Sequence, residues 1–170
     1  FISLEHLQNS LKIFSKSLGR NYRNSGILKT KKVWVEYEPH GVVGIISPWN
    51  YPLILTLTPF VEAFLAGNCV VIKSSEHTPL TTKLLKKIWD DSTEEIDLMQ
   101  IIYGTGDLGS KLVNSKYTDM ICFIGSTKVG RKIAQDCSSI FKPVILELGG
   151  KDPMIVLKDV DIERAVNAAL

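Results

Sequence analysis

A short polar stretch from Glu147 to Lys151 lies between two apolar runs and places a carboxylate beside two glycines. The apolar runs are Pro143 to Leu146 before it and Met154 to Leu157 after it. A carboxylate at the end of a buried strand is costly unless it is hydrogen-bonded, paired or used as a base. Glycines there let the backbone turn sharply or approach a ligand closely. Glu147 is therefore a candidate general base, although a solvated glutamate before a glycine turn also explains the stretch.

Other polar residues follow apolar runs in the same way. The side-chain amide of Asn50 can donate two hydrogen bonds to a developing oxyanion, and the alternative role is an Asx turn or a helix cap. Lys73 and Glu76 stand three residues apart, so together they can hydrogen-bond a ribose diol. The alternative for this pair is a surface ion pair that contributes little free energy.

Two glycine-containing turns are candidates for phosphate binding. Gly125 and Ser126 precede a helical pattern, where backbone amides and a hydroxyl can hold a phosphate, although simple N-capping also explains them. Gly104-Thr105-Gly106 resembles a glycine-rich phosphate loop. The usual dinucleotide fingerprint, Gly-x-Gly-x-x-Gly after the first strand, is missing from the sequence.

The elements that must position these residues alternate along the chain. Continuous apolar runs predict strands at Val42 to Ile46, Cys69 to Ile72, Leu98 to Tyr103, Met120 to Ile124, Val144 to Leu148 and Met154 to Leu157. Helical patterns between them lie at Pro52 to Phe64, from Thr78 through Leu80, Leu84 and Ile88, at Asp107 to Asn114 and at Thr127 to Cys137. Apolar strands that alternate with helices predict an α/β fold with a parallel sheet covered on both faces. Ligands bind at the carboxyl ends of such strands, so we expect the candidate residues at one edge of the sheet.

The first 40 residues follow a different pattern. An amphipathic helix is predicted from Ser3, as its N-cap, to Gly19, and a polar loop from Asn21 to Lys32. Val33 to Glu38 alternates between apolar and polar residues, which predicts a strand whose Trp and Tyr can cover a partner surface. A plain half-buried strand is the alternative interpretation.

Composition narrows the class of protein. The 170 residues are 45% hydrophobic and 22% charged, which is typical of a globular domain with its own core. A net charge of +2 gives no electrostatic basis for binding nucleic acid or an anionic membrane. Three cysteines, Cys69, Cys122 and Cys137, have no metal-ligand spacing and suit a reducing compartment such as the cytoplasm. All three are expected to pack in or near the core.

The chain begins without Met and stops within a helical pattern, so we expect a fragment of a longer protein.

Several longer motifs carry a resemblance to a known family. They are Glu38 to Gly44, Pro48 to Pro52, Ala66 to Asn68, Val71 to Pro79, Phe123 to Gly130 and Leu146 to Pro153. In order and spacing they resemble the aldehyde dehydrogenase superfamily, from about Val33 to the last residue. The resemblance implies a variant Rossmann domain that binds NAD, or alternatively NADP, without the usual glycine fingerprint.

The resemblance also implies roles for individual residues. Asn50 becomes the oxyanion donor, and Glu147 the base that activates water for thioester hydrolysis. Lys73 and Glu76 hold the adenine-side ribose, and Ser126 with Gly125 contacts the pyrophosphate. The remaining positions assigned to the cofactor are Ile46, Ser47, Pro48, Trp49, Ser75, Gly106, Phe123, Leu148 and Gly149. No residue is assigned to a metal.

The same resemblance suggests a division of the chain and a set of partners. Residues 1–32 form a helix and loop that pack on the cofactor domain, 33–40 a strand of an oligomerisation sheet, and 41–170 an NAD(P)-binding domain truncated at its C-terminal end. The expected partners are a small-molecule aldehyde and further copies of the same chain.

One departure from the family pattern bears on activity. The family's nucleophilic cysteine follows the motif Glu147 to Lys151 at a position that the three cysteines here do not occupy. The sequence therefore predicts the cofactor-binding portion of an aldehyde dehydrogenase, with the nucleophile outside these residues. The alternative is a non-catalytic module that binds nucleotide or pairs with another subunit. A relative that transfers the acyl group to CoA is a third reading, against which Glu147 argues.

Overall fold

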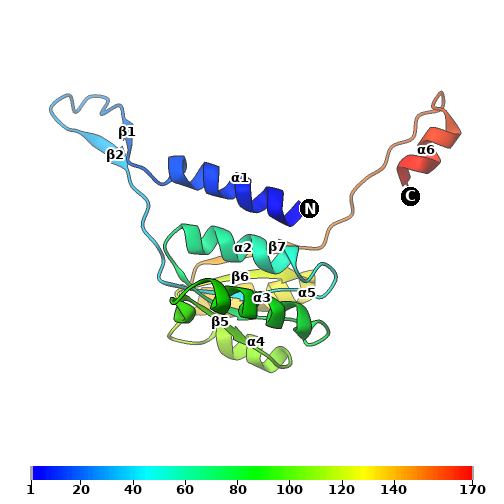
Figure 1. Ribbon diagram of the computed structural model, residues 1–170. Coiled ribbons are helices and arrows are strands. Elements are labelled where there is room, and N and C mark those ends of the chain that lie inside the picture. Colours follow the sequence, from blue (N-terminus) through cyan, green and yellow to red (C-terminus); the bar gives the residue numbers. More distant parts are fainter. Residues whose placement is uncertain (1, 170) are drawn as a thin grey trace.

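Five parallel strands form the sheet at the centre of the computed structural model, in the spatial order β5-β4-β3-β6-β7 (Figure 1). The strands are β3 (Val42–Ile46), β4 (Cys69–Lys73), β5 (Met99–Ile102), β6 (Met120–Gly125) and β7 (Val144–Leu148). The structure describes residues 2–169, apart from the side chains of residues 2–4, 6, 15 and 96. The predicted parallel sheet is therefore confirmed, whereas capping by Ser3 lies outside the described side chains.

Helices cover both faces of this sheet, as predicted. On one face, α2 (Ile54–Leu65) and α3 (Pro79–Ser92) enclose a cluster that includes Ile45, Ile72 and Met99. On the other face, α4 (Gly106–Val113) and α5 (Thr127–Ser139) enclose a second cluster that includes Ile121 and Phe123. A short 3-10 turn, η1 (Ile96–Leu98), leads into β5. Successive strand residues point to opposite faces, so one apolar strand contributes to both clusters.

The buried face of α3 differs from the face that its sequence pattern predicts. The sequence pattern places Leu80, Leu84 and Ile88 on the apolar side of this helix, which predicts that they are buried. Leu80 is instead 75% exposed, and the other two are also exposed. Instead Thr82 is buried, and Trp89 packs edge-on against Phe60 and Phe64 with ring centroids 5.3 and 5.1 Å away. Apolar residues lie on two faces of this helix. The contact of Trp89 with the aromatic rings of α2 determines which of the two faces the core.

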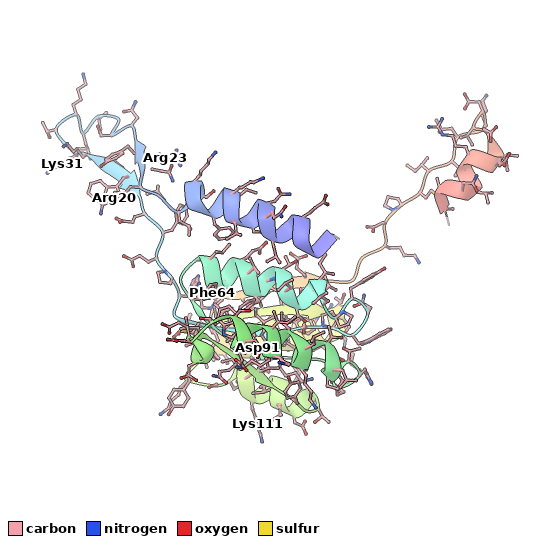
Figure 2. The ribbon with its side chains drawn as sticks, in the orientation of Figure 1. Arg20, Arg23, Lys31, Phe64, Asp91 and Lys111 are labelled. Carbon is pink, nitrogen blue, oxygen red and sulfur yellow. The ribbon has the colours of Figure 1, made fainter. Side chains whose placement is uncertain are left out.

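The N-terminal part lies outside the sheet. Helix α1 (Ile2–Ser17) lies along α2, and two short strands, β1 (Asn21–Arg23) and β2 (Val33–Val35), form a separate antiparallel ribbon (Figure 1). β1 falls in the stretch predicted to be a loop. Arg20 donates hydrogen bonds of 3.1 and 3.0 Å to Glu36, and its guanidinium lies over the Trp34 ring. Figure 2 labels Arg20 together with Arg23 and Lys31 of the same region.

Residues 151–169 extend away from the sheet (Figure 1). The predicted strand at Met154 to Leu157 is wrong, because the structure has no regular element there and Ile155 is 81% exposed. A β-strand needs a neighbouring strand to pair with, and no strand within residues 2–169 lies next to this segment. Helix α6 (Ile162–Ala169) follows. No helix within residues 2–169 is long and apolar enough to cross a membrane.

Helix α5 ends in a turn that glycine normally makes. The Phe141 amide donates to the Ser138 carbonyl at 3.3 Å, and the Lys142 amide donates to the Cys137 carbonyl at 2.9 Å. These two bonds define a Schellman motif, with Phe141 in its left-handed position at φ 56°. The Phe141 side chain is 95% exposed, so packing within the described residues does not compensate for the strained backbone.

We predict that Phe141→Gly stabilises the folded chain by about 0.5–1 kcal/mol, because glycine adopts a positive φ without strain. Thermal or denaturant unfolding measures the change. Ile140→Gly is the matched control, because Ile140 has a φ of −117° and gains nothing from glycine, so this variant should be less stable. A Phe141→Gly chain that is less stable than wild type would contradict the account of this turn.

Candidate functional site

The carboxyl ends of the five strands meet at one edge of the sheet, as their parallel pairing requires. β3 and β6 are hydrogen-bonded neighbours, yet the connection after β3 crosses one face and the connection after β6 crosses the other. This divergence makes the β3–β6 seam a topological switch point, where doubly wound sheets bind ligands. The loop that carries Asn50 follows β3, and Ser126 follows β6.

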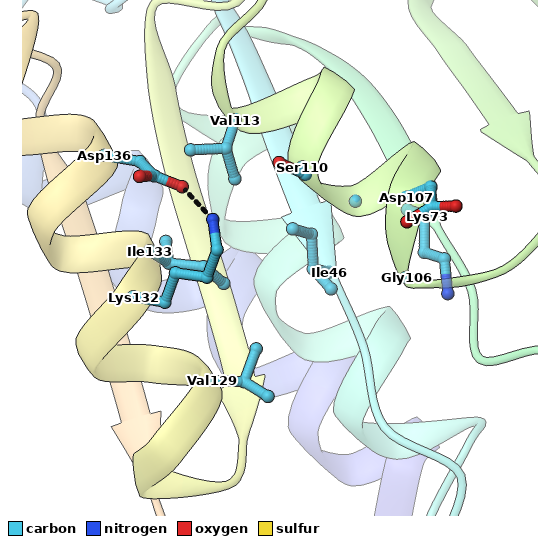
Figure 3. A pocket seen from close by; sticks show the side chains of 11 residues that line it. Ile46, Lys73, Gly106, Asp107, Ser110, Val113, Val129, Lys132, Ile133 and Asp136 are labelled. Carbon is cyan, nitrogen blue, oxygen red and sulfur yellow. Dashed lines mark hydrogen bonds and ion pairs between the residues drawn. The ribbon is translucent and has the colours of Figure 1, made fainter.

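A cavity of about 430 Å³ opens at this edge between α4 and α5 (Figure 3). Ile46 lies at its centre, with Val113 of α4 and Val129 and Ile133 of α5 around it (Figure 3). The remaining lining residues are Lys73, Gly106, Asp107, Gly109, Ser110, Lys132 and Asp136. A Cβ placed on Gly106 would meet open space, so the backbone at the start of α4 is accessible to a ligand. Apolar walls with a few polar groups are typical of sites for planar organic ligands.

Lys73 and Glu76 provide a fixed polar pair beside this cavity. Lys73 is only 4% exposed, and its Nζ donates to Glu76 Oε2 at 2.9 Å. The pKa of Glu76 is lowered, first by the hydrogen bond from its own backbone amide and second by Lys73. Burial of the ammonium distinguishes this pair from the solvated surface pair that the sequence also allowed. The Glu76 carboxylate is partly exposed and can accept further hydrogen bonds.

In the loop after β3, some residues are buried and hold the loop in place, whereas others are exposed. Ser47 is buried, and its hydroxyl accepts a hydrogen bond from Thr56 Oγ1 at 2.8 Å, which attaches the loop to α2. Pro48 is half-buried, whereas Trp49 and Asn50 are exposed. The amide of Asn50 is therefore accessible at the edge of the sheet.

Three other predicted cofactor positions, Ser126, Ser75 and Phe123, have structural contacts of their own. Ser126 is the N-cap of α5, where its Oγ accepts from the Val129 amide at 3.4 Å. Ser75 is buried and accepts from the His77 amide at 3.3 Å. The Phe123 side chain belongs to the core, so Phe123 can contribute to the edge only through its backbone.

Glu147 lies on β7, which is an edge strand and not the doubly buried strand that the sequence suggested. Glu147 pairs in register with Ile124 and is exposed. The next residue, Leu148, points to the opposite face and packs against Gly130, where any Cβ would clash. Gly149 has open space around its Cα. Glu147 is thus a carboxylate that water can reach.

Two of the three cysteines, Cys122 and Cys137, are poor nucleophiles in this fold. Cys122 is buried, and burial, followed by the charges of Glu62 and Glu147, raises its pKa to about 11. Cys137 is fully buried, and burial raises the pKa of its thiol as well. Cys69 is half-buried on β4, at the end of the strand opposite the cavity. Nucleophilic cysteines require a lowered pKa and access to solvent, which Cys122 and Cys137 lack.

The structure brings together three predicted residues, Ile46, Lys73 and Gly106, in the lining of one cavity. It also adds residues that the sequence analysis missed, chiefly Val113 and Ile133. Their spacing on amphipathic helices matches that of core residues, so no sequence signal separated cavity walls from core.

Comparisons with known proteins place the chain in one family. A sequence model of the aldehyde dehydrogenase family matches residues 3–170. Betaine aldehyde dehydrogenase of Bacillus subtilis is 42% identical over 134 residues, which are 78% of this chain and 27% of that protein. D-glyceraldehyde dehydrogenase (NADP(+)) of Picrophilus torridus is 36% identical over 144 residues, 84% of this chain and 29% of that protein.

Solved structures give the same result. The NAD+ complex of an aldehyde dehydrogenase from Bacillus cereus superimposes with a TM-score of 0.89 at 32% identity, and the match covers 98% of this chain and 34% of that one. The chain thus spans about a quarter to a third of the length of these relatives.

Proposed function

Because this chain belongs to the aldehyde dehydrogenase family, we propose that it forms the cofactor-binding part of an enzyme that oxidises an aldehyde to a carboxylic acid with NAD(P). The observation that carries the proposal is the cavity between α4 and α5, with the buried Lys73 and its partner Glu76 beside it. The relatives named above include an NAD+ complex and an NADP(+) enzyme. The nicotinamide of such a cofactor accepts a hydride when bound.

The residues of the cavity fit the adenosine half of a dinucleotide. Its volume of about 430 Å³ lies in the usual range for small-molecule sites. Ile46, Val113 and Ile133 offer apolar surfaces for a planar base, and Glu76 with Lys73 offers an acceptor and a donor for a ribose diol. The amino end of α5, which Gly125 and Ser126 precede, suits a pyrophosphate because backbone amides and the helix dipole favour anions there.

The catalytic residues of our proposal are Asn50 and Glu147. The exposed amide of Asn50 donates to the oxygen of the aldehyde as negative charge develops on it. Glu147, which water can reach, takes a proton from the water that hydrolyses the acyl intermediate. We propose that the attacking thiolate lies outside these 170 residues, and the burial and raised pKa values of Cys122 and Cys137 support this.

We further propose that the ribbon of β1 and β2 contributes to a homo-oligomer. Two-stranded ribbons are marginal by themselves, and all residues of β2 are exposed. The rings of Trp34 and Tyr22 lie on this ribbon with centroids 6.3 Å apart and planes tilted by 58°, and they provide aromatic surface for a partner. The three free cysteines support a reducing compartment, for which we propose the cytoplasm.

The first prediction from the proposed function concerns cofactor choice. A 2′-phosphate placed beside Glu76 brings like charges together, which costs about 1 kcal/mol in a partly exposed site, or about fivefold in affinity. Calorimetric titration should therefore show tighter binding of AMP than of adenosine 2′,5′-bisphosphate, and Glu76→Gln should remove the preference. Glu94→Gln, an exposed residue after the end of α3, is the control and should keep it. An unchanged preference in Glu76→Gln would refute the assignment, and no binding of AMP or NAD to wild type would refute the proposed function.

The second prediction concerns the cysteines. Iodoacetamide at neutral pH should alkylate Cys69 first and leave Cys122 and Cys137 unmodified, because a pKa of about 11 leaves the Cys122 thiol protonated. All three should react in guanidinium chloride. Peptide mass spectrometry gives the extent at each site. Rapid alkylation of native Cys122 or Cys137, together with NADH production by this chain, would mean that the nucleophile lies here.

The third prediction concerns Glu147 in the polypeptide that carries the nucleophilic cysteine. Glu147→Gln should give a first burst of NADH and then slow by about 10²–10⁴, because glutamine cannot take a proton from water. Stopped-flow absorbance and the intact mass of the acyl adduct follow the two phases. Glu163→Gln on α6 is the matched control and should turn over normally. Normal steady turnover by folded Glu147→Gln would remove Glu147 from the mechanism.

A further inference from the structure

One residue bonds to the carboxyl ends of both helices that wall the cavity. The backbone amide of Lys142 donates to the Cys137 carbonyl in the last turn of α5 at 2.9 Å. The ammonium of the same residue donates to the Val113 carbonyl at the end of α4 and to the Ser115 carbonyl, each at 2.7 Å. Lys142 therefore joins the end of α5 directly to the end of α4.

The ammonium of Lys142 has a complete set of partners. Its third bond, at 2.8 Å, goes to Thr118 Oγ1, and that hydroxyl lies 2.9 Å from the Leu112 carbonyl, to which it donates. An ammonium has three protons, so the two carbonyls and the hydroxyl use all of them. Carbonyls at the end of a helix have no partner within the helix, and a cation there is also favoured by the helix dipole. Partial burial lowers the pKa of Lys142, as expected for an ammonium withdrawn from water.

The backbone around Lys142 is held in place from both sides. Phe141 adopts a positive φ, and this turn directs the chain from α5 into β7 at Lys142. Val113 is fully buried, supplies a carbonyl to the ammonium and lines the cavity. Asp136, which precedes Cys137, lines the cavity from the opposite side. The Lys142 bridge therefore acts on both walls at once.

We propose that Lys142 is a positioning residue for the cofactor: by fixing the separation of α4 and α5, it sets the width of the adenosine cavity without touching the nucleotide. The inference rests on the proposed function, since it takes the cavity to be the adenosine site. The competing explanation is that Lys142 only stabilises the fold, so the test compares nucleotide affinity among variants of known stability.

The main experiment titrates AMP into wild type, Lys142→Met and two controls by calorimetry, well below each unfolding midpoint. Lys142→Met keeps a long unbranched side chain and removes the bridge, so AMP affinity should fall by about tenfold. Thr118→Val removes one acceptor of the ammonium and the bond to Leu112 while the bridge between the helices remains, so affinity should stay within about twofold despite lower stability. Lys111→Met removes a charge that extends from α4 into solvent and should change neither property (Figure 2).

A second measurement uses wild type alone. Coupling between sites is reciprocal, so AMP should slow hydrogen exchange at the Lys142 amide. Exchange at the Asp119 amide, which donates to the Val42 carbonyl, should not change. Wild-type affinity in Lys142→Met, an equal loss in Thr118→Val, or unchanged exchange at Lys142 would each overturn the inference. Failure of wild type to bind AMP or NAD is a different result and overturns the proposed function itself.

Discussion

The pairing of β3 with β6 is the constraint on which the rest of the structure depends. β4 and β5 extend the sheet from one side of β3, so the chain must cross back before it can add β6 on the other side. Right-handed connections then place α2 and α3 on one face and α4 and α5 on the opposite face. The connections diverge above the β3–β6 seam and leave a crevice there. The cavity, the Asn50 loop and the amino end of α5 all follow from this one pairing.

The sequence predicted the sheet well because its strands are apolar on both sides and separated by helical patterns. It failed where a pattern has more than one physical solution. The residues Met154 to Leu157 have the composition of a strand, yet the part of the chain that the structure describes offers them no neighbouring strand to pair with. Helix α3 has two apolar stripes, and contact of Trp89 with Phe60 and Phe64, which lie far away in sequence, decides which one is buried.

The residues of the candidate site could also be predicted only in part. The rule that ligands bind at the carboxyl ends of strands selected Lys73 and Gly106, and the family resemblance added Ile46; all three line one cavity. It could not select Val113 or Ile133, because an apolar helix residue that faces a cavity has the same periodicity as one that faces a core. The role of Lys142 could not be predicted from the sequence, for a further reason. Its partners Val113, Ser115 and Thr118 are 24 to 29 residues away in sequence, and two of the bonds go to backbone carbonyls that any residue type supplies.

The strand order also has a consequence for synthesis on the ribosome. β3, β4 and β5 pair in the order in which they are made, so half of the sheet can form while the chain is still being extended. β6 must wait until residue 125 has emerged before it can pair with β3, and it closes the longest loop between neighbouring strands. Until then the other edge of β3 exposes unpaired backbone groups to neighbouring chains, as edge strands do. The seam that later forms the crevice is thus also the internal edge that waits longest for its partner strand during synthesis.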